Sequence, residues 1–257
     1  MAGKFIDLNC DMGESFGRWQ LGADAAVMPH ITSANIACGA HAGDPAVMRA
    51  TFALALQHGV SCGAHPGFAD LAGFGRREIP VGPVEAGDLV LWQVGALAAI
   101  AKSAGVALSH VKTHGALYNM AARDRRLADA VAAAVASFDR SLVLFGLAGS
   151  GMLDAGRSAG LAVAAEGFAD RSYEPDGTLT PRSVAGAVVE DVHEVVDRAV
   201  LMAREGRVRT RTGTEIPLRI DTICIHGDTP GAATLAAALR QGLDRAGITV
   251  SPVRKQH

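Results

Sequence analysis

The stretch Ser33–His65, SANIACGAHAGDPAVMRATFALALQHGVSCGAH, carries the clearest signals of the fold. It begins with a short apolar run at 33–38 and leads to a second one at 60–64, with an Ala-rich segment between them. Asp44-Pro45 is a typical helix start, because Asp caps free amides and proline fits the first turn, and Gly59 is a typical helix end. The stretch therefore predicts a strand, a helix and a second, parallel strand.

The same alternation of strand and helix continues along the chain. Its apolar runs are continuous rather than alternating, which suits strands buried on both faces of a parallel sheet. We predict an α/β fold of the TIM-like (β/α) barrel type with about seven strands, although the pattern alone also allows a doubly wound sheet. The predicted strands cover residues 5–10, 33–38, 60–64, 110–113, 142–147, 161–165 and 221–225, and the predicted helices cover 44–59, 84–104, 125–137, 183–205 and 231–246.

No linker or change of composition divides the chain, so residues 1–257 are predicted to form a single domain. Residues 207–219, with Thr212-Gly213-Thr214 at the centre, predict a β-hairpin inserted before the last strand. The irregular segment from Pro66 to Pro83 is too long for an ordinary loop between a strand and a helix. We expect it to be a lid or a binding loop.

Composition limits the partners and the compartment. The formal net charge is −2 with the nine His counted as neutral, which argues against a nucleic-acid partner. The N-terminus lacks an apolar signal region, and Leu89–Ala101 reads as too short and too mixed to span a bilayer, so we expect no membrane partner and a cytoplasmic location. The four Cys, at positions 10, 38, 62 and 224, form no Cys-x-x-Cys pair and are expected to be reduced core thiols.

Ionisable and polar side chains follow almost every predicted strand. In a parallel barrel the C-terminal strand ends open on one face, so these side chains are expected to converge in one cup, and this expectation favours the barrel. A repeated Cys-Gly-Ala-His phrase, at 38–41 and 62–65, predicts two imidazoles at matching positions after successive strands. The residues are Asp7, Asn9, Asp11, Glu14, His41, His65, Lys112, His114, Glu166, Asp170, His226 and Asp228.

Each of these residues also has a structural interpretation. A lone His after a strand is usually a hydrogen-bonded structural residue, and Asp7 and Asp11 could cap turns. Lys112 is harder to explain in this way, because it is one of four lysines and lies within a predicted strand. Structural roles at every strand end would be an improbable coincidence, so we predict a site that binds or transforms a ligand.

The sequence lacks the motifs of several common enzyme classes. It contains neither the Gly-x-x-x-x-Gly-Lys-Ser/Thr phosphate loop nor a Gly-x-Ser-x-Gly nucleophile elbow. The run Gly146–Gly151 resembles a phosphate-cradling loop but lacks the dinucleotide spacing, and a helix start is its favoured interpretation.

Seven longer motifs run from residue 7 to residue 228. They read DLNCDMGESFG (7–17), SANIACGAHAGDP (33–45), GAHPGF (63–68), GFGRR (73–77), VKTHGALYN (111–119), EGFADRSY (166–173) and TICIHGD (222–228). In this order they resemble the LamB/YcsF family. The resemblance implies a seven-stranded barrel of the glycoside hydrolase/deacetylase type.

The resemblance also implies an activity: a hydrolase of a cyclic amide, as the A subunit of an ATP-dependent 5-oxoprolinase. Such a protein works with B and C subunits to convert 5-oxoproline, ATP and water into glutamate, ADP and phosphate, with ATP as a co-substrate accompanied by Mg²⁺. The expected catalytic residues are Asp7, Asp11, His41, His65, Lys112, His114, Glu166, Asp170, His226 and Asp228. The expected substrate-binding residues are Asn9, Glu14, Asn35, Arg76, Arg77, Tyr118 and Arg171.

Roles follow from residue type. Asp11 or His41 is expected to position or deprotonate the attacking water, and Lys112 and His114 to stabilise charge on the lactam oxygen or phosphate. Arg76 and Arg77 are candidates for the substrate carboxylate. Glu166 and Asp170 could orient the imidazoles or hold the Mg²⁺ of ATP.

Two alternatives stay open on the sequence. One is a metal-dependent amide hydrolase or deacetylase acting alone, with Asp11, His41 and His65 around Zn²⁺. The other is a non-catalytic subunit that presents 5-oxoproline to a partner enzyme.

Overall fold

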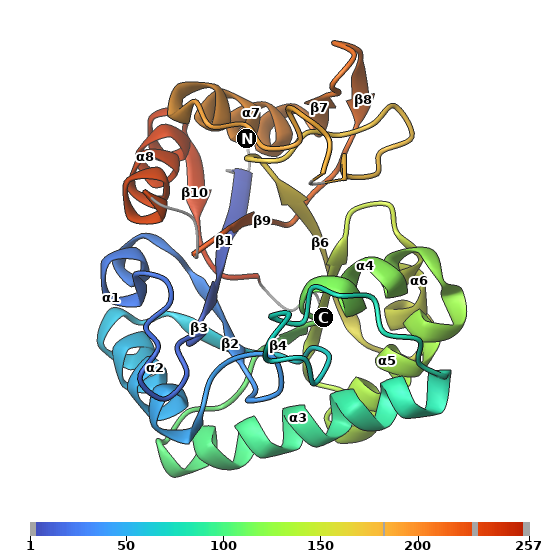
Figure 1. The fold of residues 1–257 in the computed structure, drawn as a ribbon. Helices are drawn as coiled ribbons and strands as arrows, with labels where there is room; N and C mark the ends of the chain where they lie inside the picture. The colour runs from blue at the N-terminus through green and yellow to red at the C-terminus, as the bar shows by residue number, and fades with distance from the viewer. Residues whose placement is uncertain (1–3, 182, 228–230, 254–257) are drawn as a thin grey trace.

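Seven parallel strands close into a barrel in the computed structural model, which describes residues 4–181, 183–227 and 231–253 (Figure 1). The last barrel strand pairs with both the sixth and the first, and this double pairing closes the ring. The barrel prediction is therefore confirmed. The strands are β1 (Lys4–Met12), β2 (Ser33–Ala37), β3 (Ser61–His65), β4 (His110–Lys112), β5 (Val143–Leu147), β6 (Ala162–Phe168) and β9 (Thr222–Ile225).

Helices surround this barrel, as Figure 1 shows in the view along it. Their apolar faces pack on the strands and form one large core with them. The helices are α1 (Asp24–Val27), α2 (Pro45–His58), α3 (Pro83–Ser103), α4 (Gly115–Arg123), α5 (Arg125–Phe138), α6 (Gly151–Ser158), α7 (Val192–Glu205) and α8 (Ala232–Arg245), and a 3-10 turn, η1, covers Met28–His30.

Helix α2 begins and ends where its sequence predicts. The Asp44 side chain accepts hydrogen bonds from the backbone N–H groups of Ala46 and Val47. Gly59 ends the helix in the left-handed conformation, with φ of 66°, which costs glycine little because it has no Cβ.

Helix α7 begins later than the sequence predicts. The predicted helix covers 183–205, whereas the observed one starts at Val192, where the Asp191 side chain caps the N–H of Glu194. The preceding residues bond instead to the segment after β6: Ser172 N–H donates to the Ala187 carbonyl and Val189 N–H to the Asp170 carbonyl. Tertiary hydrogen bonds therefore replace the expected first turns of this helix.

Two further features lie outside the barrel. β7 (Arg207–Arg209) and β8 (Glu215–Pro217) form an antiparallel hairpin, which projects at the upper right of Figure 1. β10 (Ile248–Val250), which was not predicted, pairs with the first residues of β1.

Helix α3 is long and apolar enough to cross a membrane by length and composition alone, which corrects the interpretation of this stretch as too short. Its buried face packs against α5 and β3 in the structure. That face also buries the polar side chain of Gln93, which is fully enclosed.

The segment 66–82 has no regular structure and leads from β3 to α3. Gln93 holds its beginning: the side-chain oxygen accepts from Gly67 N–H at 3.0 Å, and the side-chain amide donates to the Gly67 carbonyl at 2.7 Å. Further along, Phe74 has a positive φ of 54°, which is uncommon for a bulky residue. This segment therefore has a fixed path, and Phe74 lies at its most strained point.

Candidate active site

A large cavity opens at the C-terminal ends of the barrel strands. Its volume is about 950 Å³, within the range usual for small-molecule sites. Asp11, His65, Lys112 and His114 line its floor, and they come from β1, β3, β4 and the start of α4. The strand ends thus converge as a parallel barrel requires.

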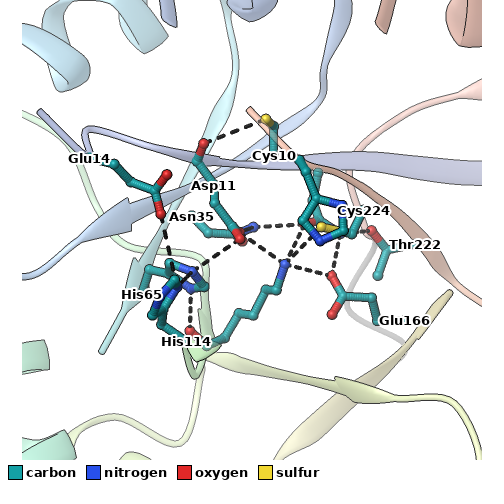
Figure 2. A network of polar contacts seen from close by, with 12 residues as sticks. Cys10, Asp11, Glu14, Asn35, His65, His114, Glu166, Thr222 and Cys224 are labelled. Carbon is teal, nitrogen blue, oxygen red and sulfur yellow. Dashed lines mark hydrogen bonds and ion pairs between the residues drawn. The ribbon is translucent and has the colours of Figure 1, made fainter. Parts of the chain in front are cut away.

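The Lys112 ammonium lies at the centre of the floor. Its Nζ is 3.0 Å from Asp11 Oδ1 and 3.0 Å from Glu166 Oε1, and Asp11 and Glu166 face each other across it (Figure 2). Burial acts to lower the pKa of Lys112, but its neighbours, Asp11 foremost among them, outweigh burial and raise the pKa well above its usual value. Lys112 is therefore a fixed positive charge at the bottom of the cavity.

Asp11 connects this charge to a group of histidines. Its Oδ1 accepts from Lys112 and from Asn35 Nδ2 at 2.9 Å, and its Oδ2 lies 3.3 Å from His65 Nε2. Burial alone would raise the pKa of the Asp11 carboxyl, but His65 and Lys112 outweigh it and hold the pKa well below its usual range. Asp11 is therefore a carboxylate.

Amide side chains below the floor hold these groups in place. Asn9 donates to Glu166 Oε1 at 2.9 Å and accepts from Asn35 Nδ2 at 2.7 Å, and its oxygen also lies 3.3 Å from Lys112 Nζ. Asn35 in turn accepts from His110 Nε2 at 2.8 Å. Asn9 and Asn35, expected to bind substrate, are fully buried and contact Lys112, Asp11 and Glu166, and neither lines the cavity.

Asp7 lies one level deeper still. Its carboxyl accepts hydrogen bonds from the hydroxyls of Thr32, Ser33 and Thr222, and Thr222 accepts in turn from Asn9 Nδ2 at 2.7 Å. Burial raises the pKa of Asp7 to about 6. Asp7 does not line the cavity, so its contacts indicate a positioning role through Thr222 and Asn9.

Three imidazoles form one cluster beside Asp11. His65 Nε2 and His114 Nδ1 are 2.9 Å apart, and His41 stacks on His114 with ring centroids 3.8 Å apart (Figure 2 labels His65 and His114). Glu14 lies next to them, with Oε1 at 3.9 Å from His114 Nδ1 and 4.0 Å from His41 Nε2. Burial lowers the pKa of His114 to about 3 and that of His41 well below its usual value, so both rings are neutral.

The two Cys-Gly-Ala-His phrases do not occupy matching positions. Strand pairing places His65 opposite Ala37, four residues before His41. His41 nevertheless reaches the cluster, because the turn after β2 folds back through Gly39 and Gly43, which both have positive φ. A Cβ on Gly43 would lie 2.9 Å from the Gly13 carbonyl oxygen, so only glycine fits this turn.

The opposite wall carries a second His–carboxylate pair. His226 Nδ1 donates to Asp170 Oδ2 at 2.6 Å, and the His226 ring stacks on Phe168 at 5.7 Å. His226 and Phe168 line the cavity. Arg171 also lines it, but its guanidinium donates to the carbonyls of Thr180 and Ala187 and so fixes the following loop. Asp228 lies outside the described residues.

The remaining expected substrate-binding residues divide into two groups. Arg76 and Tyr118 line the cavity, and the Arg76 guanidinium lies 4.9 Å from the centre of the Phe74 ring. Arg77 is not among the lining residues; it forms a salt bridge with Asp70, and its side chain is 67% exposed. Of the two arginines proposed for a substrate carboxylate, the structure brings only Arg76 to the cavity.

Sequence reasoning missed Cys224 and Thr222 as parts of the site. Cys224 Sγ lies 3.0 Å from Lys112 Nζ, and Thr222 supports Asn9. Alternation along β9 could have indicated both, because residues two and four positions before His226 share its inward side in a strand. Burial raises the pKa of Cys224 well above its usual value, so this neighbour of Lys112 is a neutral thiol.

These groups can stabilise negative charge and handle protons. A fixed ammonium at the floor suits an oxygen that becomes negative during reaction, and it acts more strongly in a site shielded from water. Neutral imidazoles beside a carboxylate suit proton transfer. The arrangement therefore fits attack of water on a carbonyl group.

Comparison with known proteins supports this chemistry. The sequence model of the LamB/YcsF family matches residues 6–257. The chain is 56% identical over 245 residues to the A subunit of 5-oxoprolinase from Bordetella pertussis strain Tohama I, covering 95% of this chain and 97% of that one. It is 52% identical over 251 residues to the A subunit of 5-oxoprolinase from Bacillus subtilis strain 168, covering 98% of each.

A solved structure has the same fold. The crystal structure of the lactam utilization protein from Thermus thermophilus superposes with a TM-score of 0.91 at 46% sequence identity. The match covers 96% of this chain and 98% of that one.

Proposed function

The chain belongs to the LamB/YcsF family, and we therefore propose that it is the A subunit of an ATP-dependent 5-oxoprolinase, which opens the lactam of 5-oxoproline to give glutamate. The Lys112 ammonium held between Asp11 and Glu166 at the cavity floor is the observation that carries the proposal. An unstrained lactam resists hydrolysis, so a cation at the position of the developing oxyanion is what the reaction needs.

ATP supplies the driving force in this proposal. Transfer of the terminal phosphoryl group to the lactam oxygen makes the carbonyl carbon more electrophilic. Water then adds to that carbon, the ring C–N bond breaks, the nitrogen takes up a proton, and hydrolysis of the phosphate bond leaves glutamate. Lys112 stabilises negative charge on the lactam oxygen as it takes up the phosphoryl group, and on the phosphate itself. Asp11 with the neighbouring imidazoles orients the water and accepts its proton.

The substrate lies above Lys112 in this arrangement. Arg76 at the rim is the group that takes the substrate carboxylate, because a guanidinium can hold two oxygens at once. His226, oriented by Asp170, faces the cavity from the opposite wall and can donate a proton to the leaving nitrogen.

The B and C subunits, Mg-ATP and a cytoplasmic location complete the proposal. Both relatives are named as one subunit of a 5-oxoprolinase, which supports assembly of this chain with other subunits. The cavity is wide enough for more than the small lactam, which leaves room for the phosphate or for a segment of a partner.

Glutamate release tests the proposal. 5-Oxoproline and Mg-ATP are incubated with the purified chain alone, and then with verified, folded B and C subunits. We expect glutamate only from the full mixture. No glutamate from that mixture would contradict the assignment.

Lys112→Ala tests the observation that carries the proposal. We expect kcat/KM of the complex to fall at least about a hundredfold, the size of effect seen when one donor to an oxyanion is removed. Lys102→Ala, an exposed lysine on α3, is the matched control and should be neutral. A Lys112→Ala complex within about threefold of wild type would show that Lys112 does not serve the reaction.

The histidine cluster favours a second candidate, a metal-dependent amide hydrolase acting alone. Release of acetate or amine from N-acetyl or amide substrates, without partners or ATP, would support this candidate over the first.

A further inference from the structure

The two central imidazoles of the cluster face each other through one ring nitrogen each. His65 Nδ1 lies 2.8 Å from the Lys112 carbonyl oxygen, and His114 Nε2 lies 2.8 Å from the Phe74 carbonyl oxygen. A carbonyl only accepts, so each of these ring nitrogens carries the hydrogen. In neutral rings the other two nitrogens, His65 Nε2 and His114 Nδ1, are then bare acceptors 2.9 Å apart. This arrangement is repulsive unless a metal ion or an added proton lies between them.

His41 adds a second, independent observation. Its side chain is fully buried, and neither of its ring nitrogens has a hydrogen-bond partner among the residues that the structure describes. A buried polar group without a partner costs about 1–3 kcal/mol, so such a group indicates a ligand. The His41 ring packs flat against His114 and reaches towards Glu14.

We propose that Glu14, His41, His65 and His114 bind one divalent metal ion of the Zn²⁺ type. Three imidazole nitrogens and one carboxylate oxygen, all within 4.8 Å of one another, form the donor set. This mixture of nitrogen and oxygen suits Zn²⁺ and its transition-metal neighbours better than Mg²⁺ or Ca²⁺, which prefer oxygen alone.

The distances fit a shared ion. Two donors that each lie about 2.1 Å from one tetrahedral ion are about 3.4 Å apart. Three of the six pairs measure 2.9, 3.9 and 4.0 Å. The widest separation in the set, up to 4.8 Å, needs a movement of about 1.4 Å, and the His41 ring, which is stacked parallel to His114, must turn to bring its nitrogen to the same ion.

The outer hydrogen bonds fit as well. Metal-bound histidines usually donate their other N–H to a carbonyl or a carboxylate, which fixes the tautomer. His65 and His114 already do so, to the carbonyls of Lys112 and Phe74.

The rival explanation for the close approach of His65 and His114 is a proton held between the two rings. Such a proton on His65 Nε2 would be shared with Asp11 Oδ2 at 3.3 Å, and titration with zinc decides between the two explanations.

The use of the ion rests on the proposed function. Four protein donors fill a tetrahedral ion, so such an ion would supply a bound water of lowered pKa beside Asp11 only by taking a fifth ligand. Asp11, with one oxygen towards His65 and the other on Lys112, would then orient that water towards a carbonyl above the ammonium.

Zinc binding to the purified, untagged and chelator-treated full chain tests the site. Calorimetric titration with ZnCl₂ should show one ion per chain and a raised Tm. His41→Ala and Glu14→Gln should each weaken Kd at least tenfold, whereas His58→Ala, at the exposed end of α2, should leave Kd unchanged. His41→Gln replaces His41→Ala if circular dichroism shows that the latter does not fold. Absence of binding, or equal binding by all variants, would overturn the site.

Failure of the site and failure of the proposed function are distinguishable. A chain that binds Zn²⁺ as expected but releases no glutamate with its partners keeps the ion site and contradicts the 5-oxoprolinase assignment. A metal-free complex that releases glutamate at the undiminished rate overturns the use of the ion in that reaction.

Discussion

At the scale of single residues, the floor of the site is a balance of buried charges. Lys112 is 3% exposed, Glu166 beside it is fully buried, and Asp11 is 15% exposed at the cavity floor. Removing one partner of a buried ion group leaves an uncompensated charge, which is the most destabilising change available there. Lys112 therefore contributes to stability as well as to the proposed chemistry.

This balance predicts the behaviour of Lys112→Met. We expect the free energy of unfolding to fall by about 3–5 kcal/mol, because Asp11 and Glu166 lose their shared cation. Adding Glu166→Gln to Lys112→Met should recover part of the loss, because one of the two carboxylates becomes neutral. Urea denaturation of the single and double variants measures this coupling, and strictly additive effects would mean that the charges do not interact.

Asp7 gives a prediction for pH. Burial raises its pKa from 3.8 to about 6, so between these values the folded protein holds a proton that the unfolded chain has released. The contribution of Asp7 to the free energy of unfolding therefore falls as pH rises, by about 3 kcal/mol in total.

Asp7→Asn removes this titration. Relative to wild type, the variant should gain about 3 kcal/mol between about pH 4 and pH 7, measured by urea denaturation at each pH. Its absolute stability can be lower, because the Thr32 and Thr222 hydroxyls would lose a carboxylate acceptor. A constant difference between the two proteins across this range would show that Asp7 titrates normally.

At the scale of elements, the barrel interior has room for the His110 side chain because its neighbour on the next strand is a glycine. Gly63 in β3 faces His110 in β4, and a Cβ on Gly63 would lie 2.2 Å from the His110 ring. His110 bonds Asn35, and Asn35 bonds Asp11. Gly63 thus supports the site through these three side chains.

Gly63→Ala should therefore disturb both stability and the site. We expect a loss of at least about 2 kcal/mol, because the His110 ring must move and its bond to Asn35 is broken. Gly82→Ala is the control, because a Cβ there meets nothing within 4 Å. Equal thermal unfolding of the two variants would show that the strand pair adapts freely.

The segment 66–82 behaves as a separate element that covers the histidine cluster. The Phe74 carbonyl bonds to His114, and the Phe74 ring lies perpendicular to that of His41. Gln93 of α3 holds Gly67. Both halves of this segment are therefore tied to the floor or to the helix behind it.

Gln93→Leu should loosen this segment. The variant leaves the Gly67 N–H and carbonyl without their buried partner, at a cost of about 1–3 kcal/mol. Limited proteolysis should then cut within 66–82 faster than in wild type, whereas Gln57→Leu, exposed on α2, should change nothing. An unchanged cleavage rate in Gln93→Leu would mean that other contacts hold the segment.

At the scale of the whole molecule, closure of the barrel gathers the site. β9 pairs with β6 and β1, so the last motif of the chain lies beside the first. The carboxyl, ammonium and imidazole groups thus come from segments as far apart as residues 11 and 226.

A single closed barrel predicts one unfolding transition. Thermal unfolding followed by far-UV circular dichroism and by fluorescence of the two tryptophans, Trp19 and Trp92, should give coincident midpoints. Separate midpoints would contradict the prediction that residues 1–257 form one domain.

Local sequence patterns were enough to predict the class of fold and most of the residues around the cavity. Continuous apolar runs, the Asp44 cap and the Gly59 stop are local signals, and polar residues at strand ends predict convergence in any parallel barrel. Lys112, Asp11, His65 and His114 therefore reached the site as expected, while their catalytic roles stay predictions.

The division of tasks among those residues follows from tertiary structure instead. Asp7, Asn9 and Asn35 lie below the floor, and Arg77 is tied to Asp70. His41 lies next to His114, although strand pairing offsets it by four residues from His65. The depth of each side chain, its ion pairs and the tautomer of each histidine depend on which side chains are in contact across the barrel. These contacts are set by the register between strands and by closure of the barrel, and no local sequence pattern encodes either of them.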